Sequence, residues 1–197
     1  DPNEQNCDIL KSSQIACPSN CTAPKCSNNF IRQKNAKCVV KDTPYGSGIF
    51  AAEPIRITEG GKIVEYVGKV RTNAQHEKVL TQQRKLKKDY GKYAVQFGYD
   101  FVIDPELEGN SGRMSNHSCN PNAELQVWLL DGFPRLYLLP LRDIEEGQQI
   151  LWFYGGSFAT GVDVTGHKLE QIECKCGEPN CQGVVGGTQS NVSVLNK

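Results

Sequence analysis

The residues best equipped for chemistry lie in one short stretch, RMSNHSCNPN, at positions 113–122. It combines the guanidinium of Arg113, the amide of Asn116, the imidazole of His117 and the thiol of Cys119. Such groups can hold a polar ligand, and the thiol can serve as a metal ligand. The composition by itself is also typical of a polar surface loop, so the surrounding sequence must decide between the two interpretations.

The thiol has many counterparts elsewhere in the chain. Nine cysteines are present, and because nine is an odd number they cannot all pair in internal disulfides. Five of them lie within the first 38 residues and three lie between positions 174 and 181. Clusters of this kind in a chain of 197 residues favour zinc sites in a reducing compartment over a disulfide scaffold.

The C-terminal cluster, CKCGEPNC, supplies the three thiols of Cys174, Cys176 and Cys181. Structural zinc takes four ligands in a tetrahedron, so the cluster needs a fourth ligand from elsewhere. Cys119 is the candidate, since it is the one cysteine between the two clusters. The alternative is that the three are reduced structural thiols.

A second zinc site is predicted near the N-terminus. Its expected ligands are Cys7, Cys17, Cys21 and Cys26, whereas Cys38 opens the apolar run AKCVV and is expected to be a core residue. Residues 1–37 lack the apolar periodicity needed to form a core, so they need a cross-link such as a bound zinc ion to hold a fold.

Composition narrows the class of protein. The length suits one domain with small appendages, and 38% hydrophobic with 22% charged residues is ordinary for a globular protein. No apolar run reaches the roughly 18 residues that a membrane span needs. The net charge of 0 argues against nucleic-acid binding by charge, and together with the lack of a finger-type Cys/His pattern it disfavours a zinc-bearing DNA-binding domain. The chain begins DPNEQ rather than with Met, as expected for a piece of a longer protein.

From residue 38 onward the sequence reads as short strands separated by Gly and Pro. This pattern indicates a mainly β domain with little helix, and these strands must position the groups above. One helix is expected over residues 73–90. The expected strands are a strand-turn-strand at 38–55, a turn and strand at 60–70, a hairpin at 92–105, a pair at 123–144 turning at Asp131-Gly132, and a last strand at 145–156. Residues 155–166 resemble a flexible linker, and residues 188–197 a loose tail.

Five motifs in order resemble those of the SET-domain protein lysine methyltransferases: YGSGIF, EYVGKV, GNSGRMSNHSCNPN, EEGQQILWFY and the post-SET motif CKCGEPNCQGVVGG. The N-terminus resembles a reduced AWS (associated-with-SET) segment, which accompanies enzymes acting on lysine 36 of histone H3. The resemblance implies small β-sheets with a knot-like C-terminal segment, flanked by zinc-binding cysteine-rich segments. It divides the chain into an AWS-like segment (1–37), a SET domain (38–160), a post-SET linker and zinc motif (161–187) and a tail (188–197).

The resemblance also implies a site. It assigns Tyr154 and Tyr93 to the channel that receives the substrate lysine, although each could instead be a core aromatic. Tyr66 is expected to serve packing, and His76 and His167 are expected to be exposed. The implied cofactor is S-adenosylmethionine, contacted by Gly46, Ser47, Gly48, Arg113, Asn116 and His117, and Cys119 would join the post-SET zinc ligands.

Several positions depart from the family pattern. Met114 and Ser115 stand where an aromatic and an apolar residue are usual, and Phe153 replaces a commonly polar residue. Trp152 occupies the position that helps to set how many methyl groups are added, and its bulk predicts mono- or dimethylation. The AWS-like segment has fewer cysteines than the usual two-zinc version. This difference weakens the resemblance to enzymes acting on lysine 36 more than the resemblance to the SET domain itself.

The expected function is therefore S-adenosylmethionine-dependent methylation of a lysine on the histone H3 tail or nucleosome, on chromatin in the nucleus. Lysine 36 is the first choice and lysine 4 or another histone lysine the alternative. A catalytically inactive SET-fold scaffold that binds chromatin is the competing hypothesis. No membrane partner and no sequence-specific nucleic-acid binding are expected.

Overall fold

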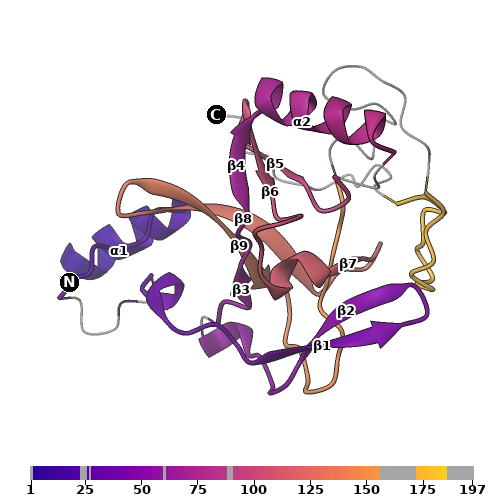
Figure 1. Cartoon of the computed structure of the whole chain (residues 1–197). Helices are drawn as coiled ribbons and strands as arrows, with labels where there is room; N and C mark the ends of the chain where they lie inside the picture. The colour runs from indigo at the N-terminus through magenta and orange to yellow at the C-terminus, as the bar shows by residue number, and fades with distance from the viewer. Residues whose placement is uncertain are drawn as a thin grey trace.

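Short strand pairs organise the chain from Cys38 to Trp152 in the computed structural model, which describes residues 2–22, 26, 28–59, 61–87, 91–155 and 172–185 (Figure 1). Strands β1 (Cys38–Thr43) and β2 (Gly46–Ala51) form one antiparallel pair. Strands β8 (Ala123–Leu130) and β9 (Phe133–Pro140) form another, and β3 (Val64–Glu65) joins the free edge of β9. The expected mainly β fold is confirmed.

Two further strand sets complete the domain. Strands β4 (Lys69–Thr72), β6 (Phe101–Asp104) and β5 (Val95–Phe97) form a sheet in the order β4-β6-β5. Strand β7 (Asn116–His117) pairs in parallel with β10 (Leu151–Trp152). The last strand predicted at 145–156 thus shrinks to two residues, since a turn with Gly147 at φ 83° precedes it.

The strand predicted at 60–70 is split into β3 and β4. Gly68 lies between them, where a Cβ atom would approach the backbone of Asp104 and Pro105 to 2.7 Å. Only glycine allows the two segments to cross this closely. The β8–β9 turn behaves as predicted, because Asp131 (φ 53°) and Gly132 (φ 80°) adopt the positive φ values that a two-residue hairpin turn favours.

Two α-helices lie among the described residues. Helix α2 (Asn73–Lys85) begins as predicted, with a capping box in which Thr72 and Gln75 exchange hydrogen bonds. Helix α1 (Pro2–Ser12) was not predicted, because its sequence PNEQNCDILKS carries almost no apolar stripe. It packs instead through Cys7 and Leu10 onto the N-terminal cysteines. Three-residue or four-residue 3₁₀ turns are η1 (Phe30–Arg32), η2 (Ile57–Glu59) and η3 (Ser111–Met114).

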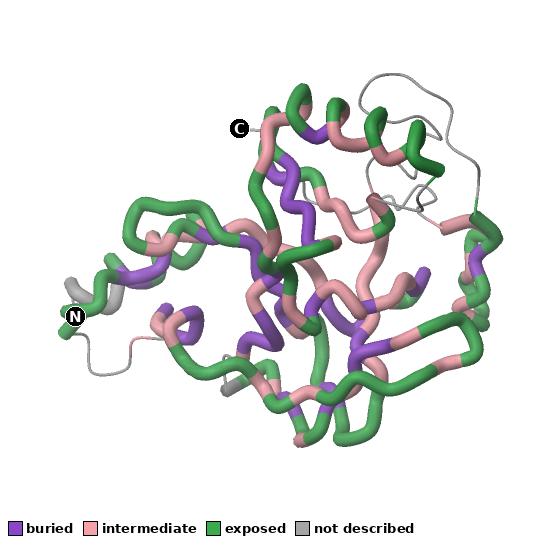
Figure 2. Tube along the Cα trace, viewed as in Figure 1, coloured by how far each residue is buried: buried purple, intermediate pink, exposed green. Residues whose placement is uncertain are grey.

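The core runs through the centre of the molecule, where buried segments of β2, β3 and β9 meet (Figure 2). The N-terminal segment is attached to the β8–β9 hairpin. Phe30 meets Trp128 edge to face at 5.0 Å, and Arg32 donates to the carbonyl oxygen of Cys17 and to Asp131. Within the described part of the chain no helix is long and apolar enough to cross a membrane.

The expected linker lies outside the described residues from position 156 onward, as do the whole 188–197 tail and His167. The 172–185 segment, yellow in Figure 1, lies beside the tip of the β1–β2 hairpin, where Lys175 Nζ is 5.7 Å from the Tyr45 ring centroid.

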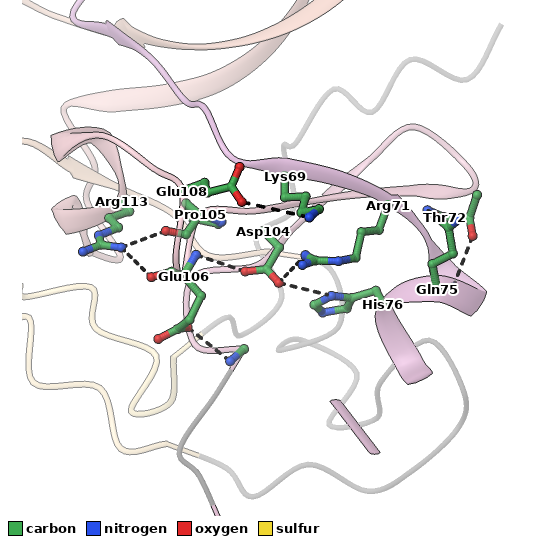
Figure 3. A network of polar contacts seen from close by, with 11 residues as sticks. Lys69, Arg71, Thr72, Gln75, His76, Asp104, Pro105, Glu106, Glu108 and Arg113 are labelled. Atoms are coloured by element: carbon green, nitrogen blue, oxygen red, sulfur yellow. Dashed lines mark hydrogen bonds and ion pairs between the residues drawn. The ribbon is translucent and has the colours of Figure 1, made fainter. Parts of the chain in front are cut away.

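The expectation that His76 is exposed is wrong. Its side chain is only 8% exposed and faces Asp104, with Nδ1 3.7 Å from Oδ2 (Figure 3). Burial lowers the pKa of His76, and the nearby Asp104 only partly offsets this. Helix α2 is polar on nearly every face, so its sequence gives no apolar stripe to show which residues turn inward.

Asp104 joins α2 to the β4-β6-β5 sheet. Its carboxylate accepts from Arg71 Nη1 at 2.6 Å and from the Glu106 N–H at 3.0 Å (Figure 3). The Asp104 and Arg71 side chains are 1% and 13% exposed. Removing one partner of a buried pair strands the other charge, which typically costs about 3–5 kcal/mol.

Asp104→Ala is therefore expected to lower the free energy of unfolding by about 3 kcal/mol in urea titrations, the smaller figure reflecting the partial exposure of Arg71. Glu108→Ala is the matched control, because the Glu108–Lys69 pair is 4.0 Å long and exposed. Equal stability of the two variants would contradict a structural role for Asp104.

Candidate active site and zinc clusters

The parallel pairing of β7 with β10 brings the polar stretch 113–122 beside residues 151–154. Asn122 locks the two together: its Oδ1 accepts from the Leu151 N–H at 2.8 Å and its Nδ2 donates to the Gln149 carbonyl at 2.8 Å. Ser115, Ser118 and Cys119 are 1%, 0% and 2% exposed. The stretch is therefore a largely buried or half-buried part of the framework, with only Asn120 exposed, and the surface-loop interpretation is wrong.

Tyr154 is fixed at both its backbone and its hydroxyl. The hydroxyl donates to the Ser115 carbonyl at 2.6 Å, and the backbone N–H donates to His117 Nδ1 at 3.0 Å. Burial raises the pKa of Tyr154 well above its usual range. The phenol therefore stays protonated, and because its O–H donates to the Ser115 carbonyl, its oxygen can meet a further hydrogen-bonding group only as an acceptor.

Trp152 reaches the same carbonyl as Tyr154. Its indole N–H donates to the Ser115 oxygen at 3.3 Å, and its ring centroid lies 4.6 Å from that of Tyr154. Two aromatic tips thus meet at one backbone oxygen. The residue type at position 115 gives no sign of this role, because the acceptor is a backbone carbonyl that every residue carries.

Tyr93 is held by two residues from different elements. Its carbonyl accepts from the Tyr66 hydroxyl at 2.7 Å, and the Arg113 guanidinium lies 5.5 Å from its ring centroid. Burial, with the nearby hydroxyls of Tyr154 and Tyr93, raises the pKa of Tyr66. Tyr66 packs in the core with Phe97, as expected, and also orients Tyr93.

Arg113 is anchored by backbone rather than by a carboxylate. Its Nη1 donates to the carbonyls of Pro105 and Glu106, each at 2.8 Å (Figure 3). Arg113 is not among the residues that line the neighbouring cavity. Its assignment as a cofactor contact stays a prediction, and its observed contacts are those of a support for Tyr93.

A cavity of about 690 Å³ opens beside these residues, within the range of small-molecule sites. Segments far apart in sequence line it: the tip of the β1–β2 hairpin, Lys92, the β7–β10 pair with the neighbouring Gln149 and Tyr154, and the post-SET segment, which the structure describes over residues 172–185. Its lining residues are Thr43, Pro44, Tyr45, Lys92, Asn116, His117, Gln149, Leu151, Tyr154, Ile172, Glu173, Cys174, Lys175, Cys176 and Val185.

The predicted cofactor residues meet this cavity to different degrees. Asn116 and His117 line it directly. Ser47 lies behind them, where its carbonyl accepts from Asn116 Nδ2 at 3.1 Å. Gly46 (φ 108°) opens β2, and Gly48 is so close to Gln149 that a Cβ atom would fall 2.4 Å from Nε2. The two glycines therefore shape the hairpin, while Asn116 ties it to β7.

His117 is neutral at physiological pH, because burial lowers its pKa to about 4. Its Nδ1 accepts from Tyr154, so the proton of the neutral ring lies on Nε2. A general-base role is thus unnecessary to explain its place in the site.

The post-SET cluster brings together Cys119, Cys174, Cys176 and Cys181, with all four sulfur atoms within 4.8 Å of one another. Zn–S bonds of about 2.3 Å in a tetrahedron place sulfur atoms about 3.8 Å apart. Cys119 and Cys174 lie at 3.8 Å. The predicted fourth ligand is therefore where zinc needs it, and the cluster could hold a zinc ion.

The thiols of this cluster lie in a setting suited to metal-bound thiolates. The Gln182 and Gly183 N–H groups donate to Cys119 and Cys181, each at 3.4 Å. Burial raises the pKa of Cys174 to about 12. The pKa of Cys176 falls to about 7: burial raises it, but hydrogen bonds with backbone groups and with the neighbouring thiols together outweigh burial. A zinc ion would supply the charge that keeps all four deprotonated.

The N-terminal cluster has the same construction. The sulfur atoms of Cys7, Cys17, Cys21 and Cys26 all lie within 4.8 Å of one another, so this cluster too could hold a zinc ion. Cys7 lies 3.6 Å from Cys21 and 3.5 Å from Cys26. Asn28 donates to Cys17 at 3.3 Å. Cys38 is half-buried against the core and belongs to neither cluster, as expected.

Comparison with known proteins agrees with the resemblance of the five sequence motifs to the SET-domain family. The SET domain model matches residues 46–155. The chain is 34% identical over 195 residues to histone-lysine N-methyltransferase ASHR3 of Arabidopsis thaliana, covering 96% of this chain and 37% of the relative. It is 33% identical over 180 residues to histone-lysine N-methyltransferase ash1 of Drosophila melanogaster, covering 90% and 8%.

A third relative is the H3 lysine-36 specific histone-lysine N-methyltransferase of Cryptococcus neoformans, 33% identical over 183 residues, with 89% of this chain and 20% of the relative covered. The chain thus spans between 8% and 37% of the length of these three relatives. The domain match covers more than half of the chain and includes β7, β10 and Tyr154. The chain therefore belongs to the SET-domain family.

Proposed function

We propose that this chain is an S-adenosylmethionine-dependent protein-lysine N-methyltransferase acting on the histone H3 tail in chromatin. The observation that carries the proposal is the meeting of Asn116, His117 and Tyr154 on one cavity, with the Tyr154 hydroxyl fixed by Ser115. The names of the relatives support the histone substrate, and a nuclear location follows from it.

The cavity fits S-adenosylmethionine in size and in chemistry. Lys92 offers a cation for a carboxylate, and Asn116 and Gln149 offer amides among apolar groups. When bound, this cofactor supplies a methyl group on a sulfonium for direct displacement by an amine. The protein's tasks are to align the amine, keep it neutral and exclude water.

The tyrosines perform the alignment in this proposal. Because the Tyr154 proton is engaged by Ser115, the phenol oxygen accepts an N–H of the substrate amine and turns the nitrogen lone pair toward the cavity. Tyr93, which contacts Tyr66 and Arg113, is not among the residues that line the cavity and is proposed to line the lysine channel beside Tyr154. Free lysine has a pKa near about 10.4, and burial in such a channel beside a cation favours the neutral amine.

The substrate would bind as an added strand. Among the strands of the described residues, the sheet order β4-β6-β5 leaves β5, two residues beyond Tyr93, at an edge. Main-chain hydrogen bonds along such an edge hold an extended peptide while one side chain enters the channel. Lysine 36 of H3 is the proposed target, with lysine 4 or another histone lysine as the alternative.

The test uses labelled S-adenosylmethionine with recombinant nucleosomes, beside matched nucleosomes in which arginine replaces lysine 36 of H3. Label on H3 that disappears with the arginine histone is expected. Label that persists would assign another lysine. Cofactor binding by calorimetry without transfer to any histone, from a folded and zinc-loaded chain, would instead favour the inactive scaffold.

Trp152 is proposed to limit the number of methyl groups. Its indole occupies the space beside Tyr154 and is tethered to Ser115, which leaves little room for a methylated amine. Wild-type product is expected to be mono- and dimethyl-lysine. Trp152→Phe is expected to raise the trimethyl fraction roughly 10-fold, the scale set by a change of one small group in a pocket, as measured by mass spectrometry.

Trp128→Phe is the control for this prediction. Trp128 is the other tryptophan of the chain and packs on Phe30, away from the site. It is expected to leave the product distribution unchanged. Trimethyl-lysine as the main wild-type product would contradict the role given to Trp152.

A further inference from the structure

The His117 imidazole contacts a different partner through each of its nitrogens. Nδ1 accepts from the Tyr154 N–H at 3.0 Å, and Nε2 lies 3.5 Å from Cys119 Sγ. Since Nδ1 is the acceptor, the ring proton lies on Nε2 and is directed at the sulfur. One side chain thus joins the backbone of the proposed catalytic tyrosine to a proposed zinc ligand.

Two tilted aromatic rings also pack against the imidazole. The rings of Phe153 and Tyr154 lie against it with centroids at 5.1 and 5.4 Å. Its backbone is paired with Trp152 in the β7–β10 register, and the Ser118 N–H donates to the Trp152 carbonyl at 3.1 Å. These contacts and the backbone pairing oppose movement of the ring relative to residues 152–154.

The Cys119 sulfur, the second contact of the imidazole, also contacts residues of the post-SET segment. Cys119 is 2% exposed, lies 3.8 Å from Cys174 Sγ and accepts from the Gln182 N–H. A zinc ion held by the four thiols would fix the position of this sulfur relative to residues 174–182. Groups that hydrogen-bond a metal ligand orient it and affect metal affinity.

We infer that His117 is a positioning residue that couples the post-SET zinc cluster to the placement of Tyr154. That this placement governs methyl transfer rests on the proposed function. The coupling itself is a property of the two hydrogen bonds and is measurable whether or not the chain transfers methyl groups.

Two substitutions are each designed to remove one of the two His117 contacts and to keep the other. In His117→Asn the side-chain oxygen can take the place of Nδ1 and accept from Tyr154, while the contact with Cys119 is lost. In His117→Gln the longer side chain can place its N–H at the sulfur, while the acceptor for Tyr154 is lost. His76→Asn and His76→Gln are the controls, because His76 is another buried histidine, and its ring faces Asp104 and is outside both cysteine clusters.

Three readouts apply to each variant: zinc release to a chromogenic chelator, hydrogen exchange of the Tyr154 amide, and kcat for methyl transfer. The post-SET phase of zinc release is identified by its loss in Cys119→Ser. His117→Asn is expected to release this zinc roughly 10-fold faster while Tyr154 stays protected. His117→Gln is expected to retain zinc at the wild-type rate, to expose the Tyr154 amide, and to lower kcat roughly 10- to 100-fold.

The wild-type chain provides a test that needs no variant. Chelation is expected to speed exchange of the Tyr154 amide while the buried β9 amide of Leu138 keeps its protection. Unchanged Tyr154 exchange after zinc loss would overturn the inference, as would variants that both match wild type or that both lose zinc and Tyr154 protection alike. A response of Tyr154 without any methyl transfer would uphold the coupling and reject the proposed function.

Discussion

Tyr154→Phe is expected to lower kcat for methyl transfer by roughly 100-fold or more, the usual scale for loss of a positioned catalytic hydroxyl. The change removes the oxygen that orients the amine and leaves the ring packed on Trp152 and His117. The Ser115 carbonyl keeps its hydrogen bond from the Trp152 indole, so the loss of stability should be no more than about 1 kcal/mol.

Steady-state kinetics with calorimetry of cofactor binding checks this prediction. Cofactor affinity should change little, because the hydroxyl is directed at Ser115. Tyr99→Phe is the matched control: Tyr99 is 92% exposed, so this change should alter neither kcat nor cofactor affinity. If Tyr154→Phe transferred methyl groups at the wild-type rate, the catalytic hydroxyl would have to be sought elsewhere, with Tyr93 the next candidate.

Cys119→Ser is expected to abolish cofactor binding and methyl transfer together. Residues 172–176 and Val185 form one wall of the cavity, and the thiol of Cys119 joins that wall to β7. Structural zinc contributes about 10 kcal/mol or more to the folding of the segments it joins, far more than the few polar contacts that would remain. Loss of one ligand should therefore release the post-SET segment.

Zinc content and calorimetry test the prediction. Wild type should hold one zinc ion in each of the two cysteine clusters, and Cys119→Ser should hold one in the N-terminal cluster alone. Cys38→Ser is the control, because Cys38 lies outside both clusters and burial raises its pKa to about 11, which keeps it a neutral thiol. Undiminished zinc content and cofactor affinity in Cys119→Ser would refute the post-SET site.

The sequence predicted those parts of the site that depend on residue type. Four thiols are needed for zinc, so three neighbouring cysteines required a distant fourth, and Cys119 lies with them. The Asp131-Gly132 turn fixed the β8–β9 hairpin through positive φ values. The run of helix formers from position 73 predicted the start of α2, where the structure adds a capping box at Thr72.

Features that depend on tertiary contacts could not be predicted. Helix α1 exists because Cys7 faces the other N-terminal cysteines, a cause that lies outside the helix's own sequence pattern. His76 is buried because it meets Asp104 from another strand. The acceptor shared by Trp152 and Tyr154 is a backbone carbonyl, which any residue at position 115 would supply.

The most direct test of the central claim is mass spectrometry of histone H3 after nucleosomes react with S-adenosylmethionine and this chain, with Tyr154→Phe run in parallel. The expected result is one methylated H3 lysine, carrying one or two methyl groups, with the modification absent or strongly reduced in the variant. Methylation that is equally strong with Tyr154→Phe, or no methylation from a folded and zinc-loaded wild-type chain, would contradict it.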